Sequence, residues 1–175
     1  MLPDRVIRHG RVEPERWRFL ATTPEEAIPA VLPAGPIAAP LAAWKARRAE
    51  FLQRREPVGV WLASADDPAE IAPDLGHLSL VAVHFPKFAD GRGFSTAVLL
   101  RTRFGYRGEL RAFGDVGRDQ LFELARCGFD AFSLAPHRDP ESALAGLEPF
   151  SLRYQGSVDD PLPLFRKRFA AGATR

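Results

Sequence analysis

The sequence has one cysteine, few lysines and no long apolar run, and the scarcity of cysteine and of apolar runs excludes several classes of protein. Among the 175 residues there is one cysteine, Cys127, which excludes a disulfide framework and a zinc or iron–sulfur site built from several thiolates. No apolar stretch approaches the roughly 18 residues that a transmembrane helix needs. Residues 1–20 are charged throughout and lack the apolar segment of a secretory signal. We therefore expect a cytoplasmic protein without a membrane partner.

The charge is nearly balanced, with 24 Lys+Arg against 22 Asp+Glu and a formal net charge of +2. The lysines are Lys45, Lys87 and Lys167, so the basic residues are mostly arginines, a bias typical of GC-rich genomes. The densest basic clusters, in residues 45–55 and 166–168, lack the interleaved aromatic residues of a nucleic-acid surface. We expect no nucleic-acid partner. The sequence does not determine the oligomeric state, and a homo-oligomer is one of the alternatives that it leaves open.

Proline and glycine divide the chain into four predicted parts. Residues 1–20 are predicted to form a β-hairpin or an extended arm, with Gly10 in the turn. Residues 21–40 hold five of the 16 prolines and are predicted to be an irregular connector, because proline is excluded from helix interiors and central strands. Residues 41–150 are predicted to be an α/β core, and residues 151–175 a C-terminal strand followed by an extended tail.

Within the core, short apolar runs alternate with predicted helices at residues 41–55, 94–104, 117–127 and 139–147. A further helix start is predicted at residues 66–70, and both this start and the one at Asp139 have an acidic cap followed by proline, Asp67-Pro68 and Asp139-Pro140. The run at residues 58–62 is unbroken and apolar, which is typical of a strand that is buried on both faces. Three further strands are predicted at residues 80–85, 109–113 and 131–134. The sequence predicts an α/β fold with a parallel sheet of about four strands and crossover helices, preceded by a small N-terminal β-hairpin. An open sheet and a partial βα barrel both satisfy the right-handed crossover rule, and both remain open.

Ligands of parallel sheets bind at the carboxyl ends of the strands, which directs attention to the loops that follow the four predicted strands. The loop after the second strand is rich in charge and glycine, and the helix that follows it offers free backbone N–H groups to an anion. The candidate anion-binding residues are Lys87, Asp90, Gly91, Arg92, Gly93 and Ser95 in this loop, Asp115 and Arg118 after the third strand, and His84 and His137. The alternative is architectural: Asp90 caps the helix, the glycines form the turn and Arg92 pairs with an acid.

His84 and His137 are both expected near the carboxyl ends of the strands, where two imidazoles are suited to acid–base work. No metal-ligand spacing such as HxH or HExxH accompanies them, so no metal site is predicted. The sequence contains no complete nucleophile–base arrangement and no flavin, nicotinamide, haem or iron–sulfur signature. The catalytic residues and the cofactor therefore stay unknown at this point.

Four ordered strings resemble one bacterial family, the domain of unknown function 934. They are FPKFADGRGFS at residues 85–95, GELRAFGDV at 108–116, RDQLF at 118–122 and RCGFDAF at 126–132. The resemblance extends over residues 55–168 and includes the C-terminal tail, whereas the N-terminal residues resemble the family only loosely.

Members of this family are typically encoded beside assimilatory sulfite reductase in proteobacteria. The resemblance implies an accessory protein of cytoplasmic sulfate and sulfite reduction, which assists sulfite reductase or another sulfate-reduction enzyme by docking or by electron or cofactor delivery. The alternative is an enzyme that binds a small anionic substrate at the carboxyl ends of the strands. Some members of the family carry the label oxidoreductase, which is the reaction class this alternative implies. The tail docks either on its own domain or on a partner.

Overall fold

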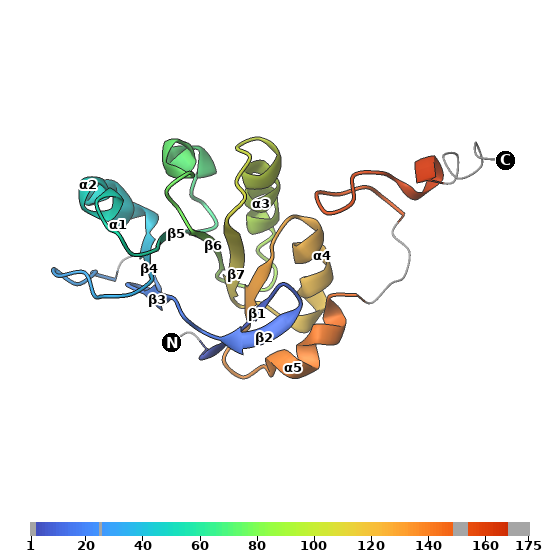
Figure 1. The fold of residues 1–175 in the computed structure, drawn as a ribbon. Helices are drawn as coiled ribbons and strands as arrows, with labels where there is room; N and C mark the ends of the chain where they lie inside the picture. The colour runs from blue at the N-terminus through green and yellow to red at the C-terminus, as the bar shows by residue number, and fades with distance from the viewer. Residues whose placement is uncertain (1–2, 25, 149–153, 168–175) are drawn as a thin grey trace.

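The computed structural model describes residues 3–24, 26–148 and 154–167 of the chain (Figure 1). Within these residues, eight strands form one sheet in the order β2-β1-β8-β7-β6-β5-β4-β3. Their bounds are Arg5–Arg8 for β1, Arg11–Pro14 for β2, Arg18–Phe19 for β3, Ile37–Pro40 for β4, Val58–Leu62 for β5, Leu80–Phe85 for β6, Glu109–Gly114 for β7 and Ala131–Ser133 for β8.

The sheet is mostly parallel, as the sequence predicts, but it is larger than the expected four strands. Strands β3 to β8 run parallel to one another, and the predicted strands correspond to β5, β6, β7 and β8. The predicted hairpin is present: β1 and β2 pair antiparallel around His9 and Gly10, which both have positive φ. It is part of the sheet, because Ile7 and Arg8 also pair antiparallel with β8.

The prediction that residues 21–40 form only an irregular connector is wrong at their end, where β4 lies between β3 and β5. Ile37, Ala38 and Ala39 are fully buried there. Pro40 is tolerated because it is the last residue of the strand and its φ of −62° suits the start of the helix that follows. The strand predicted near residues 151–155 lies largely outside the described residues.

The helical segments are short, and most of them follow the predicted positions. Their bounds are Leu41–Ala46 for α1, Arg48–Leu52 for α2, Pro68–Asp74 for η1, Arg92–Thr102 for α3, Arg118–Gln120 for η2, Leu121–Arg126 for α4, Pro140–Ala143 for α5 and Leu144–Gly146 for η3. The predicted acidic caps are confirmed, since Asp67 accepts from the N–H of Ala69 and Asp139 from those of Glu141 and Ser142. None of the described helices is long and apolar enough to cross a membrane.

The two faces of the sheet have separate hydrophobic cores. One face packs against the helices, through side chains such as Val60, Val83 and Leu110 on the strands and Leu100 on α3. The opposite face carries a smaller, largely aromatic core of Trp17, Ala38, Trp61, Leu80, Ala82 and Phe113, with Phe19 packed against it. The two sets are separate because successive side chains along each strand point to opposite faces of the sheet.

The sheet is curled into a half-barrel, and the chain connectivity requires this shape. Strands β2 and β3 lie at opposite edges, yet only residues 15–17 connect them. A flat eight-stranded sheet would separate its edges by roughly 34 Å. Four consecutive Cα steps span at most about 14 Å. The connection therefore crosses the concave side, where Phe19 packs on Phe113 with ring centroids 5.1 Å apart and Trp61 donates its indole N–H to the carbonyl of Ala21 at 3.0 Å.

We expect Gly59→Ala to destabilise the protein by about 1–3 kcal/mol, because overpacking a buried strand contact costs this much. A Cβ at Gly59 would lie 2.8 Å from the Cβ of Leu80 and 2.9 Å from its backbone oxygen, which cannot move independently of β6. Gly76→Ala is the matched control, since a Cβ there meets nothing within 4 Å. Urea denaturation of both variants is the measurement. Equal midpoints would contradict the tight β5–β6 contact.

Candidate functional site

The loops at the carboxyl ends of the parallel strands form one rim, as the sequence analysis expects. Arg92 donates to the hydroxyl of Ser64 at 2.9 Å, which joins the loops after β5 and β6. The N–H of Phe88 donates to Asp115 at 3.0 Å, which joins the loops after β6 and β7. Arg138, in the loop after β8, lies 4.0 Å from Asp115. The structure therefore brings the predicted loops together.

Much of the charge on this rim is neutralised within the rim itself. Arg92 forms a two-pronged ion pair with Asp90, from Nε at 2.9 Å and Nη2 at 2.7 Å. The hydrogen bonds from Arg92, and next that of Ser64, hold the pKa of Asp90 well below its usual range. This geometry is the architectural alternative for Arg92, in which the guanidinium pairs with an acid.

The two glycines of this loop have different roles. Gly93 is the second residue of α3 and lies against β6, where a Cβ would come within 2.5 Å of the ring of Phe85. Gly91 precedes the helix with a φ of −82° and has open space around it. Neither residue adopts positive φ. Gly93 is required for the close packing of α3 against β6, whereas Gly91 has neither a steric nor a backbone requirement for glycine.

The remaining rim candidates are less enclosed. Lys87, Ser95, Arg118 and His137 are exposed, and His84 is half-buried. The ring of His84 lies 4.9 Å from that of Phe113 and 6.0 Å from that of Trp61, and burial there lowers its pKa. Within the described ranges, no hydrogen bond or ring contact joins His84 to His137. The part of the chain that the structure describes also contains no cluster of three or more potential metal ligands among His, Cys, Asp and Glu.

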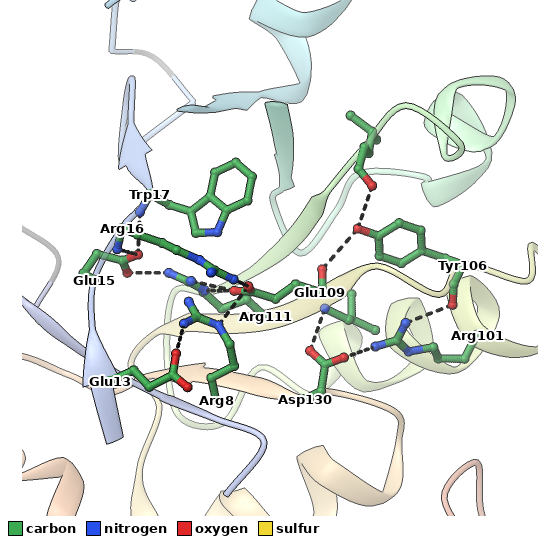
Figure 2. A network of polar contacts seen from close by, with 12 residues as sticks. Arg8, Glu13, Glu15, Arg16, Trp17, Arg101, Tyr106, Glu109, Arg111 and Asp130 are labelled. Carbon is green, nitrogen blue, oxygen red and sulfur yellow. Dashed lines mark hydrogen bonds and ion pairs between the residues drawn. The ribbon is translucent and has the colours of Figure 1, made fainter. Parts of the chain in front are cut away.

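A buried charge network at the opposite, amino-terminal end of the strands was not predicted from the sequence (Figure 2). Arg111 on β7 is fully buried, donates from Nε to Glu109 at 2.9 Å and also pairs with Glu15. Arg8 on β1 donates to the other oxygen of Glu109 at 3.0 Å and pairs with Glu13. The network thus ties the first strands to the centre of the sheet.

The carboxylates of this network respond to burial in different ways. Burial opposes the ionisation of Glu109, but Arg111 and Arg8 outweigh it and hold the pKa of Glu109 below its ordinary value. Asp130 accepts from the N–H of Leu110 at 2.8 Å and from Arg101 at 2.7 Å, yet burial raises its pKa. Glu109 and Asp130 therefore both accept hydrogen bonds from arginine side chains.

A cavity of about 390 Å³ opens beside this network. Its polar lining includes Arg8, Arg16, Trp17, Arg107, Glu109 and Asp130, and Pro36 and Pro57 contribute apolar wall. These residues come from β1, from the β2–β3 connection and from positions at or before the amino ends of the parallel strands. The cavity is therefore at the end of the sheet opposite to the predicted rim.

One sequence signal pointed toward this network. The strand predicted at residues 109–113 reads ELRAF, in which Glu109 and Arg111 alternate with apolar residues although the strand is buried on both faces. Charged side chains inside such a strand require partners. The partners Arg8 and Glu15 lie about a hundred residues earlier in the chain, so local patterns do not identify them.

We expect Glu109→Gln to destabilise the protein by about 3–5 kcal/mol at neutral pH, because it leaves Arg8 and Arg111 buried with less negative charge. Glu13→Gln is the matched control: the Glu13 side chain is 42% exposed and pairs with Arg8 at the edge of the network, so we expect a loss of at most about 1 kcal/mol. Urea denaturation measures both values. Equal losses in the two variants would contradict a network centred on Glu109.

The stability difference between the wild type and Glu109→Gln is expected to depend on pH. Because the folded-state pKa of Glu109 lies below the ordinary value of 4.5, its carboxylate contributes stability that is present above pH 4.5. That contribution is lost as the pH falls through the lowered pKa of the folded state. The stability difference between the wild type and Glu109→Gln therefore narrows on acidification below pH 4.5.

Comparison with known proteins finds one family. A family model described as a bacterial protein of unknown function (DUF934) matches residues 59–165, and no curated protein matches the chain. The matched region begins in β5 and contains the rim loops, Glu109, Arg111 and the C-terminal segment. It does not include β1, β2 or the β2–β3 connection.

Proposed function

Because the chain belongs to the DUF934 family of bacterial proteins, we propose that it is an accessory protein of cytoplasmic assimilatory sulfite reduction. In this role it docks to sulfite reductase, or to another enzyme of sulfate reduction, and assists turnover or the delivery of electrons or a cofactor. The sulfur connection is the implication of the resemblance described above, and the docking mode is supported by the surface of the C-terminal segment.

The segment 154–167 carries most of the large apolar side chains that the described residues leave exposed. Tyr154, Leu162 and Phe165 are 73%, 55% and 51% exposed, and the other two are Val31 and Phe88. Exposed apolar and aromatic side chains that gather on one segment are typical of protein-interaction surfaces. This concentration is the observation that carries the docking proposal.

The segment is anchored although its apolar side chains face outward. The hydroxyl of Ser157 and the N–H of Val158 both donate to the carbonyl of Arg126 at the end of α4, at 2.7 and 3.1 Å. The N–H of Leu164 donates to the carbonyl of Tyr154 at 3.0 Å and closes the segment into a loop. The segment projects beyond α4 in Figure 1, so a partner has access to it. An anchored loop loses less conformational freedom on binding than a free tail.

The reactive groups of the described residues favour the accessory role over catalysis. Burial raises the pKa of the Cys127 thiol, so the thiolate that a nucleophile needs is disfavoured at neutral pH. Asp90 and Arg92 are engaged with each other on the rim. A nucleophile with an adjacent base is not formed by the rim residues that the structure describes.

We expect the double variant Tyr154→Ser/Phe165→Ser to bind the sulfite reductase of the same organism at least about tenfold more weakly, because apolar anchors carry most of an interface's binding energy. Val31→Ser is the control, since it removes an 83% exposed apolar side chain elsewhere and is expected to bind like the wild type. Co-purification, affinity and reductase turnover are the measurements. Separate elution of the wild type and the reductase, with unchanged turnover, would overturn the proposal.

The second candidate is an enzyme that binds a small anionic substrate at the rim. It is favoured by the convergence of the loops and by Lys87 and Arg118, two exposed cations for which the described residues offer no ion-pair partner. Its expected result is a thermal shift with sulfate or sulfite that is lost in Lys87→Gln/Arg118→Gln. A shift that persists in this double variant would exclude these cations as the anion site.

A further inference from the structure

We propose that the cavity at the amino-terminal end of the strands binds an organic anion, whose anionic oxygens accept hydrogen bonds from Arg8, the indole N–H of Trp17 and the exposed side chains of Arg16 and Arg107. The proposal does not depend on the accessory role or on the rim. It rests on unpartnered buried donors, on the charge that lines the cavity and on the cavity's size and walls.

Two buried hydrogen-bond donors at this cavity have no acceptor. Arg8 is 4% exposed; its Nε and Nη1 are engaged by Glu109 and Glu13, but its Nη2 is buried without a partner. Trp17 is 6% exposed and its Nε1 is likewise buried and unpartnered. Native proteins rarely leave such groups unsatisfied. The Nε atoms of Arg54, Arg126 and Arg138 are also unpartnered, but these residues do not line this cavity. Both residues line the same cavity, so one ligand can supply both acceptors.

The other tryptophans show that the orphaned indole of Trp17 is unusual in this protein. Trp44 donates its indole N–H to Asp74 at 2.9 Å, and Trp61 donates to the carbonyl of Ala21 at 3.0 Å. In Figure 2 the Trp17 indole lies above the Arg16 and Glu109 side chains, with its nitrogen directed toward them. Arg16 and Glu109 line the same cavity as Trp17, so a ligand bound there would lie on the side toward which the indole N–H is directed.

The charged groups that line the cavity and remain available to a ligand are positive, which favours an anion. Arg16 is largely exposed and only reaches Glu109 at 3.5 Å, and Arg107 is exposed with no ion-pair partner within the described residues. The carboxylates that line the cavity are committed elsewhere: Glu109 to Arg8 and Arg111, and Asp130 to Arg101. Two cations thus remain available to a ligand, and guanidinium groups match carboxylate, sulfonate and phosphate oxygens.

The size and walls of the cavity favour an organic anion over an inorganic one. Its volume of about 390 Å³ lies within the range of small-molecule sites, which begins near roughly 300 Å³. The indole of Trp17 and the rings of Pro36 and Pro57 provide apolar wall beside the arginines. A ligand with an anionic group at the Arg8–Trp17 end and a flat or apolar body against these rings uses both parts of the lining.

The test uses the full chain labelled with ¹⁵N, in which the indole N–H of each of the three tryptophans gives one NMR signal. The probes are the organic anions benzenesulfonate and phenyl phosphate. Inorganic sulfate and phosphate carry the charge without the ring, and benzenesulfonamide carries the ring without the charge. We expect the organic anions to shift the Trp17 signal, assigned with Trp17→Phe, while those of Trp44 and Trp61 move little. The inorganic ions and the sulfonamide are expected to bind at least about tenfold more weakly.

Exposed arginines supply variants that leave the buried network in place. Arg16→Gln and Arg107→Gln are each expected to lower the affinity for the organic anions by roughly tenfold. Arg103→Gln is the control, because Arg103 is an exposed arginine at the end of α3 that does not line the cavity, and this variant is expected to bind as the wild type does. A Trp17 signal that no probe moves, or affinities unchanged in Arg16→Gln/Arg107→Gln, would overturn the proposal. An equal response to inorganic sulfate and benzenesulfonate would overturn its assignment to an organic anion.

Discussion

The pairing of Arg111 with Glu15 and Glu109 is the interaction on which the shape of this protein depends. Glu15 belongs to the short connection between the two edge strands, and Arg111 lies in the interior of β7. Their ion pair holds the connection across the concave side of the sheet, while the Glu15 carboxylate also accepts from the N–H groups of Arg16 and Trp17. A buried arginine is tolerated only where acids meet it, so the curl and the charge network require each other.

The charged side chains at the two ends of the sheet are paired in different ways. At the carboxyl end, Asp90 and Arg92 satisfy each other, and Asp115 ties one loop to the next. At the amino end, the carboxylates are used up by buried arginines, and donors on Arg8 and Trp17 remain without acceptors. A parallel α/β sheet directs attention to its carboxyl end, where Ser133 Oγ and Arg138 Nε are also buried without partners. At the amino end, however, two unpartnered donors lie on residues that line one cavity.

Local sequence patterns were reliable where burial and capping are local. The apolar runs predict β5 to β8, and the Asp67 and Asp139 caps occur as expected because each needs only the next two or three residues. Strands β3 and β4 escaped prediction because β3 has two residues and β4 is an alanine-rich run bounded by prolines. Their strand conformation comes from pairing with β5 and with each other.

The amino-acid sequence by itself determined the alternation of strands and helices, the rim loops and the family, since each of these is written in contiguous residues. Only the tertiary structure decided that the sheet curls, that the N-terminal residues supply both of its edges, and which donors stay unsatisfied. The physical reason is that Arg8 and Glu15 meet Glu109 and Arg111 through strand register, across about a hundred residues of chain. Until that register exists, the same charges are ordinary solvated groups.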